Sequence, residues 1–362
     1  MIMIIGFTSG GLLKTSGVDR TVFEIALSLA KNNECHIFTL KGAVDEELRN
    51  LAEDRGIQIH ELAYGNTKIL RRYMLLRKYR ILKNYNLDVI VSNDYILGIM
   101  AVLAKIPLLR TYYGHGLFFS TIFRNPLRWL NNVIEDLPQV HAAKFNLPIS
   151  KFCEYELKKI YGTKVKSRVI YLGVNLDVFK PQGDKKILPE KSIVFVGKIT
   201  PSKGIHLVMR ALKMTKFSDV HLFIIGKIGS RDYYNKLQKY KLKNVHFLGT
   251  VPFFDLPKYY RGSYLTISGT KYDYFNLPFL ESQACGTPVI GFDKAAIPEV
   301  VNHKKTGLLC KNLKEMSSNI KLLLENPDLR NSMGKNAIKW VRKFNWENTA
   351  KNYEKVLKEA VR

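Results

Sequence analysis

Short apolar runs alternate with amphipathic segments along most of the chain. Apolar, β-branched runs predict strands at 2–7, 35–40, 58–62, 89–92 and 108–113. Helical spacing separates these runs, as in 17–30, where Val18, Val22, Ile25 and Leu29 recur at intervals of three or four residues. Strands that alternate with helices predict a parallel, doubly wound sheet, which binds ligands at the carboxyl ends of its strands.

The alternation stops once and then starts again. A run at 168–172 predicts one more strand, and the stretch that follows is polar and contains two prolines. A strand at 192–197 opens a second series. Because 362 residues can form two hydrophobic cores, we expect two α/β domains. The predicted parts are an N-terminal domain at 1–173, a linker at 174–191, a C-terminal domain at 192–345 and an amphipathic last helix at 346–362.

The stretch at 264–292 carries the strongest functional signal. Its pattern predicts a strand, a polar loop at 269–276, a short helix and another strand. Asn276 can cap the helix, Pro278 suits its first turn, and Gly286 ends it.

Two carboxylates flank the start of this helix. Asp273 and Glu281 stand with seven residues between them, and the side chain of Glu281 leans back toward the helix N-terminus. A helix N-terminus attracts phosphate, and carboxylates accept hydrogen bonds from sugar hydroxyls. An anion seat with hydroxyl acceptors beside it suits a nucleotide-sugar.

The segment 273–289 reads DYFNLPFLESQACGTPV. It resembles the motif EGFGLPxLEAxAxGxPV of retaining glycosyltransferase family 4, with Asp273 in place of the first Glu, Tyr274 in place of the first Gly and Asn276 in place of the second. The resemblance implies a GT-B fold, in which two doubly wound Rossmann-like domains face a central cleft. It also implies that Glu281 holds the donor ribose and Asp273 the donor sugar, beside Asn276 and Leu277.

Three further motifs resemble the family in the same order along the chain. SGVDR contains Gly17 in a glycine loop that lets backbone N–H groups approach an anion, and YYGHG places His115 where the family positions the donor sugar. VGKITPSKG resembles the family's GRLxxxKG, so Lys198 and Lys203 are expected to clamp the donor diphosphate, with Lys198 in place of an arginine. The C-terminal helix is expected to pack back on the N-terminal domain, as in the family.

The charge and the cysteine content indicate the kind of partner and the cellular location to expect. Lys and Arg number 57 against 31 Asp and Glu, a formal net charge of +26, which favours anionic partners. The basic segment 68–85 has helical spacing and can be a solvated helix face or a surface for anionic lipid. The four cysteines are scattered and no apolar run reaches the roughly 20 residues of a membrane span, so we expect a cytoplasmic protein, peripheral to the membrane as a hypothesis.

The sequence therefore predicts a metal-independent transferase without a cofactor. Its expected donor is a UDP- or GDP-linked sugar, and its expected acceptor is a glycan or a lipid-linked acceptor. A sugar-nucleotide epimerase of the same fold stays open as an alternative, as does a basic nucleic-acid-binding protein, although no nucleic-acid-binding motif is recognisable. A glycoside hydrolase would use two carboxylates but has no need of the cationic clamp.

Overall fold

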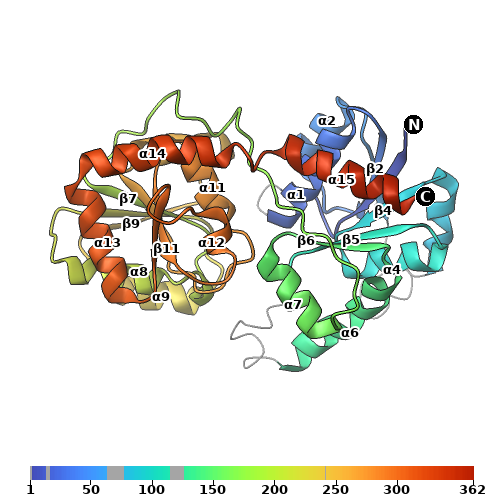
Figure 1. Ribbon diagram of the computed structural model, residues 1–362, viewed down its shortest axis with the longest axis horizontal. Helices are drawn as coiled ribbons and strands as arrows, with labels where there is room; N and C mark the ends of the chain where they lie inside the picture. Colours follow the sequence, from blue (N-terminus) through green and yellow to red (C-terminus); the bar gives the residue numbers. More distant parts are fainter. Residues whose placement is uncertain (1, 14–16, 63–76, 115–125, 241) are drawn as a thin grey trace. The chain divides into compact units, whose positions relative to one another are not determined.

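The chain forms two compact units (Figure 1). The structure is a computed structural model that describes residues 2–13, 17–62, 77–114, 126–240 and 242–362. The first unit comprises Met1–Gly173 together with Trp346–Arg362, and the second comprises Val174–Asn345. The stretch 174–191, for which the sequence suggests a linker, thus belongs to the second unit.

The first unit is built on a six-stranded parallel sheet in the order β3-β2-β1-β4-β5-β6. Its strands are β1 (Ile4–Thr8), β2 (Glu34–Leu40), β3 (Gln58–Leu62), β4 (Val89–Ser92), β5 (Leu108–Tyr112) and β6 (Phe145–Pro148). Its helices are α1 (Gly17–Leu29), α2 (Glu46–Glu53), the 3₁₀ helix η1 (Tyr79–Tyr85), α4 (Tyr95–Ala104), α6 (Pro126–Ala142), α7 (Lys151–Tyr161) and α15 (Trp346–Ala360).

Helices cover both faces of this sheet because successive strand residues point to opposite sides. On β5, buried Arg110 pairs with Asp136 of α6 on one face. The next residue, Thr111, contacts Tyr353 of α15 on the other face, with 3.0 Å between the two hydroxyl oxygens. The last helix of the chain therefore packs on the sheet of the first unit, where it also contacts α1.

The second unit repeats the plan, with six parallel strands in the order β12-β11-β10-β7-β8-β9. Its strands are β7 (Ser192–Val196), β8 (His221–Ile225), β9 (Val245–Gly249), β10 (Leu265–Ile267), β11 (Val289–Phe292) and β12 (Gly307–Cys310). Its helices are η2 (Pro201–Lys203), α8 (Ile205–Thr215), α9 (Arg231–Lys239), η3 (Phe253–Asp255), α10 (Leu256–Gly262), α11 (Leu277–Ala284), α12 (Ile297–Val300), α13 (Leu313–Glu325) and α14 (Pro327–Val341).

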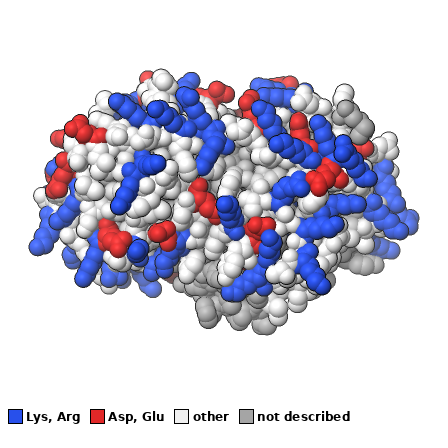
Figure 2. Space-filling model, viewed as in Figure 1, with Lys and Arg blue, Asp and Glu red and all other residues white. Residues whose placement is uncertain are grey.

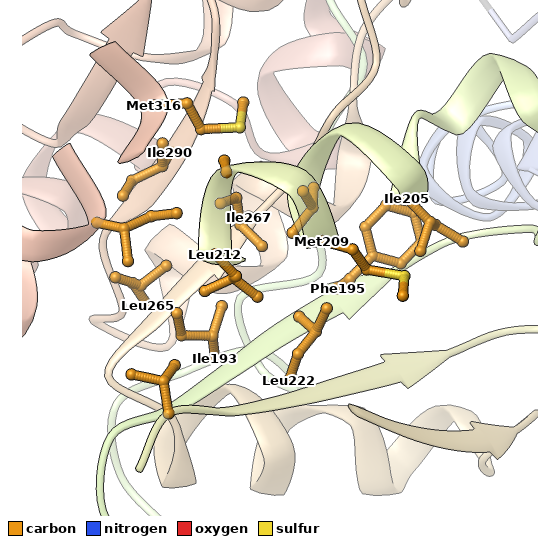
Figure 3. Close-up of a cluster of buried hydrophobic side chains, with 14 of the residues drawn as sticks. Ile193, Phe195, Ile205, Met209, Leu212, Leu222, Leu265, Ile267, Ile290 and Met316 are labelled. Carbon is orange, nitrogen blue, oxygen red and sulfur yellow. The ribbon is translucent and has the colours of Figure 1, made fainter. Parts of the chain in front are cut away.

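A continuous apolar core joins the sheet of the second unit to the helices on one face (Figure 3). Alternate residues of the central strands, such as Ile193, Phe195 and Ile267, meet Leu212 of α8 and Met316 of α13. Each of these side chains is at most 5% exposed. The core therefore fixes the central strands, whose carboxyl ends carry the loops described below.

The strand order reverses at one defined point in each unit. From β7 the chain continues to β8 and β9 on one side and then returns to place β10 on the other side. The strand order therefore reverses between β7 and β10, and at such a point open α/β sheets bind ligands at their carboxyl edge. In the first unit the equivalent point lies between β1 and β4.

In the first unit, two segments differ from the secondary structure that the sequence predicts. Residues 168–172 donate backbone hydrogen bonds from Arg168 and Ile170 to Asn146 and Pro148 of β6, but they form no regular strand. Half of the basic segment, residues 68–76 of 68–85, lies outside the described residues. Its described end is the 3₁₀ helix η1, in which Leu82 is buried in the core and after which Asn86 takes a left-handed conformation.

Candidate functional site

The loops that follow β7 and β10 touch each other through two glycines. A Cβ atom added to Gly204 would collide with the carbonyl oxygen of Gly269, and one added to Gly269 would collide with that of Gly204. Gly204 also has a φ of 67°, a conformation that L side chains rarely adopt. Both positions require glycine, and their contact holds the two loops together at the point where the strand order reverses.

An ion pair joins the same two loops. The Nζ atom of Lys203 lies 2.8 Å from Oδ2 of Asp273, and the two side chains are 35% and 16% exposed. The other carboxylate oxygen of Asp273 accepts the backbone N–H of Tyr274 at 2.9 Å. The structure thus brings together two residues that the sequence assigned to separate parts of a ligand.

Lys198 lies in the loop that directly follows β7, and its side chain is exposed. The stem of this side chain passes over Gly229, since a Cβ atom added there would lie 2.8 Å from Cγ of Lys198. Backbone hydrogen bonds from Gly229 and Ser230 to the carbonyl of Ile199 fix the loop beneath it. The loop between β7 and α8 therefore carries two cations at the carboxyl edge of the sheet.

Helix α11 begins beside these loops, as its sequence predicts. Asn276 is the N-cap residue, and its side-chain oxygen accepts the backbone N–H of Phe279 at 3.3 Å. Its φ and ψ are 46° and 64°, in the left-handed region that asparagine tolerates better than most residues. Leu277 and Pro278 form the first turn, where the unpaired N–H groups of a helix face outward.

Glu281 is buried one turn into α11, with 5% of its surface exposed. Its Oε2 atom accepts a hydrogen bond of 2.9 Å from the hydroxyl of Tyr260, which lies on α10 and is fully buried. Sequence reasoning missed Tyr260, because no pattern links two residues 21 positions apart on different helices. The carboxylate therefore has a protein partner that also orients it.

The electrostatic setting of this edge is mainly positive. Burial lowers the pKa of His206, at the start of α8, and the nearby cations Arg210 and Lys271 lower it further. The hydroxyl of Tyr233 contacts Nδ1 of this histidine at 2.7 Å. A ligand with negative charge would find cations here, together with the start of α11.

The remaining candidate residues belong to the first unit. Gly17 is the first residue of α1, is exposed, and has open space where a Cβ atom would lie. His115 lies outside the described residues; the chain is described up to Gly114, which follows β5 with a φ of 89°. The structure therefore does not test the role of His115.

A polar pocket opens in the first unit near the carboxyl ends of β4 and β5. Asn93, Asp94, Tyr113 and Gln139 line it, together with the buried Arg110. The hydroxyl of Tyr113 donates to Oδ1 of Asn93 at 2.9 Å. Within the described residues, Nη1 of Arg110 has no hydrogen-bond partner, so the pocket offers one buried donor beside amide, hydroxyl and carboxyl groups.

Two kinds of feature are absent from the described ranges. No helix in them is long and apolar enough to cross a membrane. No three His, Cys, Asp or Glu side chains in them converge as ligands for a metal ion would.

Family models match both units. Residues 15–178 match the model described as Glycosyltransferase Family 4, and residues 179–340 match the model described as Glycosyl transferases group 1. An uncharacterized glycosyltransferase of Methanocaldococcus jannaschii is 31% identical over 254 residues, which is 63% of this chain. The chain spans 65% of that relative's length.

Solved structures match almost the whole chain. Sucrose-phosphate synthase from Thermosynechococcus elongatus superposes with a TM-score of 0.84 at 21% identity and covers 99% of this chain and 98% of its own. The Anabaena protein HepE, crystallised with UDP-glucose, gives a TM-score of 0.81 at 17% identity and covers 99% of this chain and 100% of its own. At these identities the likeness establishes the fold, which is that of the GT-B glycosyltransferases, as the sequence predicted.

Proposed function

The chain belongs to the family 4 glycosyltransferases, and from this premise we propose that it transfers a sugar from a nucleotide-diphosphate donor, with retention of configuration. The observation that carries the proposal is the meeting of Lys203, Asp273 and the start of α11 where the strand order of the second unit reverses. Cations, an anion-binding helix start and hydroxyl acceptors are the groups that a sugar attached to a diphosphate requires.

We propose that different residues of the second unit bind different parts of the donor. Lys198 and Lys203 contact the diphosphate, and the N–H groups at the start of α11 donate hydrogen bonds to its oxygens. Charge grows on this diphosphate as the bond to the sugar breaks, so preorganised cations stabilise the transition state more than the bound donor. Glu281, held by Tyr260, accepts hydrogen bonds from the ribose, and Asp273 accepts them from the donor sugar.

The donor is proposed to be UDP- or GDP-linked. Support for UDP comes from HepE, which shares the fold and was crystallised with UDP-glucose. The reaction is proposed to need no metal ion, because the two lysines supply the positive charge that a divalent cation would bring to the diphosphate. His115 is proposed to position the donor sugar, and the glycine loop that contains Gly17 is proposed to let backbone N–H groups approach an anionic group of the donor.

The acceptor is proposed to be a glycan or a lipid-linked acceptor that the first unit binds. The polar pocket beside β4 and β5 supports this part, because its amide and hydroxyl groups can exchange hydrogen bonds with sugar hydroxyls. Cytoplasmic location and attachment to an anionic membrane surface are hypotheses that rest on the net charge of +26.

A panel of UDP- and GDP-linked sugars, with and without candidate acceptors, tests the proposal. We expect one donor to be hydrolysed slowly alone and consumed faster with an acceptor, equally well in excess EDTA, and the product to keep the anomeric configuration of the donor by NMR. Release of an isomerised sugar nucleotide without acceptor would identify an epimerase instead. Loss of activity in EDTA that a divalent cation restores would contradict metal independence.

A further inference from the structure

The ion pair between Lys203 and Asp273 occupies groups that the donor also needs. Lys203 directs its ammonium at Oδ2 of Asp273, 2.8 Å away, and Oδ1 of the same carboxylate accepts the N–H of Tyr274. Both carboxylate oxygens therefore have protein partners. A sugar hydroxyl can gain full use of Oδ2 only when Lys203 leaves it.

The backbone fixes the positions of the two residues of this ion pair. Lys203 stands directly before Gly204, and Asp273 stands four residues after Gly269. The backbones of these two glycines are in contact, so the loops cannot separate without breaking that packing. A third support comes from the backbone N–H of Ala296, which donates to the carbonyl oxygen of Asp273 at 3.2 Å.

We propose that the donor binds by exchanging this ion pair. The diphosphate takes the ammonium of Lys203 from Asp273, and the released Oδ2 then accepts a hydrogen bond from a hydroxyl of the donor sugar. This inference rests on the proposed function, because it assigns the diphosphate and the sugar to the same two residues. It adds that their binding is coupled and that Asp273 selects nucleotides that carry a sugar.

Electrostatics gives the direction of the coupling. A carboxylate 2.8 Å from Lys203 cancels much of the cation's attraction for a diphosphate. A nucleoside diphosphate without sugar must break the ion pair and gives Asp273 no new partner. A sugar nucleotide breaks the same pair but supplies hydroxyl donors to the freed oxygen. The ion pair therefore penalises the product nucleotide relative to the donor, which favours product release.

Substitution of Asp273 by asparagine separates the two effects. Titration calorimetry is carried out with UDP and UDP-glucose, and in parallel with GDP and GDP-mannose, on the wild-type chain and on Asp273→Asn. An ion pair of this exposure contributes up to about 1 kcal/mol, so we expect UDP to bind about fivefold more tightly to Asp273→Asn. We expect UDP-glucose to gain nothing or to weaken, because the neutral amide is a poorer acceptor for sugar hydroxyls.

A matched control removes the same charge from the opposite edge of the same sheet. Asp219 pairs with Lys191 before β8 and β7, at the amino ends of the strands. Asp219→Asn should leave the affinity for UDP unchanged within twofold. In a Lys203→Met background, Asp273→Asn should lose its effect on UDP, because no cation remains for the diphosphate to take.

The possible outcomes separate the two proposals. Tighter UDP binding in Asp273→Asn, absent from Asp219→Asn and from the Lys203→Met background, supports the exchange. Unchanged or weaker UDP binding in Asp273→Asn would overturn it and leave Asp273 as a residue that orients Lys203. If the wild-type chain bound neither nucleotide series, the proposed function would fall and the exchange with it.

Discussion

Asn276 adopts a backbone conformation that few side chains accept. At a φ of 46° it stands where the family motif has glycine, and its side chain also caps α11. Asparagine is enriched in this region among non-glycine residues, so the substitution keeps the turn at small cost. It also adds a hydrogen bond that glycine lacks, which is why the start of α11 keeps its position despite the departure from the motif.

Alanine and glycine at position 276 should therefore behave differently. We expect Asn276→Ala to lower the free energy of unfolding by about 2 kcal/mol, because it loses the cap and strains the backbone. Asn276→Gly should cost only a few tenths of a kcal/mol. Urea denaturation of the full chain measures both.

The control is Asn312, which caps α13 from an extended conformation with a φ of −149°. Asn312→Ala loses a cap without strain and should cost about 1 kcal/mol. An equal loss for alanine at positions 276 and 312 would show that the left-handed backbone contributes nothing.

Two substitutions of Glu281 should differ in their effects on stability and on sugar transfer. Glu281→Gln keeps an oxygen that can accept from Tyr260, so we expect stability within about 1 kcal/mol of wild type but at least tenfold slower transfer. Glu281→Ala leaves the buried hydroxyl of Tyr260 without this acceptor and should also cost about 1–3 kcal/mol of stability. Transfer assays and urea denaturation on the same preparations separate the effects; normal turnover in Glu281→Gln would remove Glu281 from the donor site.

At this scale the sequence predicted what depends on near neighbours. The cap at Asn276, the first turn at Pro278 and the end at Gly286 follow from local backbone preferences, and the structure has each of them. The contact between Glu281 and Tyr260 depends on how α10 and α11 pack. The pairing of Lys203 with Asp273 depends on the order of the strands. Local sequence therefore predicts neither the contact of Glu281 with Tyr260 nor the pairing of Lys203 with Asp273.

At the scale of elements, two histidines on neighbouring strands are expected to make the stability of one edge of the first sheet depend on pH. Nδ1 of His36 on β2 lies 2.9 Å from Nε2 of His60 on β3, and Nε2 of His36 lies 3.0 Å from Oε1 of Glu34. Because Glu34 can only accept when ionised, His36 donates to it and accepts from His60. The ring of Tyr85, from η1, lies 4.4 Å from that of His60, so strand, strand and 3₁₀ helix meet in one stack.

This stack predicts a loss of stability in mild acid. Burial and, to a smaller extent, the neighbouring His36 together lower the pKa of His60 to about 4. The unfolded chain, with an ordinary histidine pKa near 6.5, binds more protons between pH 6.5 and 4, so stability falls as the pH falls through that window. Because His60 is only half-buried, we expect about 1 kcal/mol rather than the full shift.

Urea denaturation at pH 7 and pH 5 measures this loss. In His60→Gln the difference between the two pH values should shrink by about 1 kcal/mol relative to wild type. His141→Gln, on an exposed helix end, should leave the difference unchanged and serves as the control. A wild-type pH dependence in His60→Gln would show that the stack does not titrate in this range.

The alternation of strands and helices was visible in the sequence because each buried strand of a parallel sheet is a short apolar run. The segment 168–172 shows the limit of that signal. Its apolar residues predict a strand, and it does run beside β6, but it makes only two backbone hydrogen bonds to that strand. Apolar content shows that a segment is buried, whereas a regular strand also needs a continuous ladder of backbone hydrogen bonds, to which Pro148 of β6 contributes no N–H.

At the scale of the molecule, the positive charge is the most general feature. Lys and Arg exceed Asp and Glu by 26, and Figure 2 shows cations spread over the viewed face rather than gathered in one patch. The sequence gives the total, but only the fold decides which cations share a surface. Half of the basic segment 68–85, which can be a solvated helix face or a surface for anionic lipid, lies outside the described residues, so its role stays a prediction.

This prediction can be tested by sedimentation with lipid vesicles. Each lysine or arginine near an anionic surface contributes roughly 1 kcal/mol, so four or five that face lipid suffice for reversible binding. We expect binding to vesicles of phosphatidylcholine with phosphatidylglycerol but not to phosphatidylcholine alone. Binding should fade at 1 M salt, where the Debye length is about 3 Å.

Two variants with the same loss of charge decide whether the segment itself binds. Arg71, Arg72, Arg77 and Lys78 changed together to glutamine should abolish most of the binding, because all four lie within eight residues of one another. Lys304, Lys305, Lys311 and Lys314, exposed on the second unit, are changed in the control. If membrane attachment uses the basic segment, the control keeps its binding, since lipid contact depends on local rather than total charge. An equal loss of vesicle binding in both variants would show that binding depends on net charge and not on the basic segment. Binding that did not depend on anionic lipid would contradict the electrostatic attachment, and the cations would then serve only to keep the protein soluble.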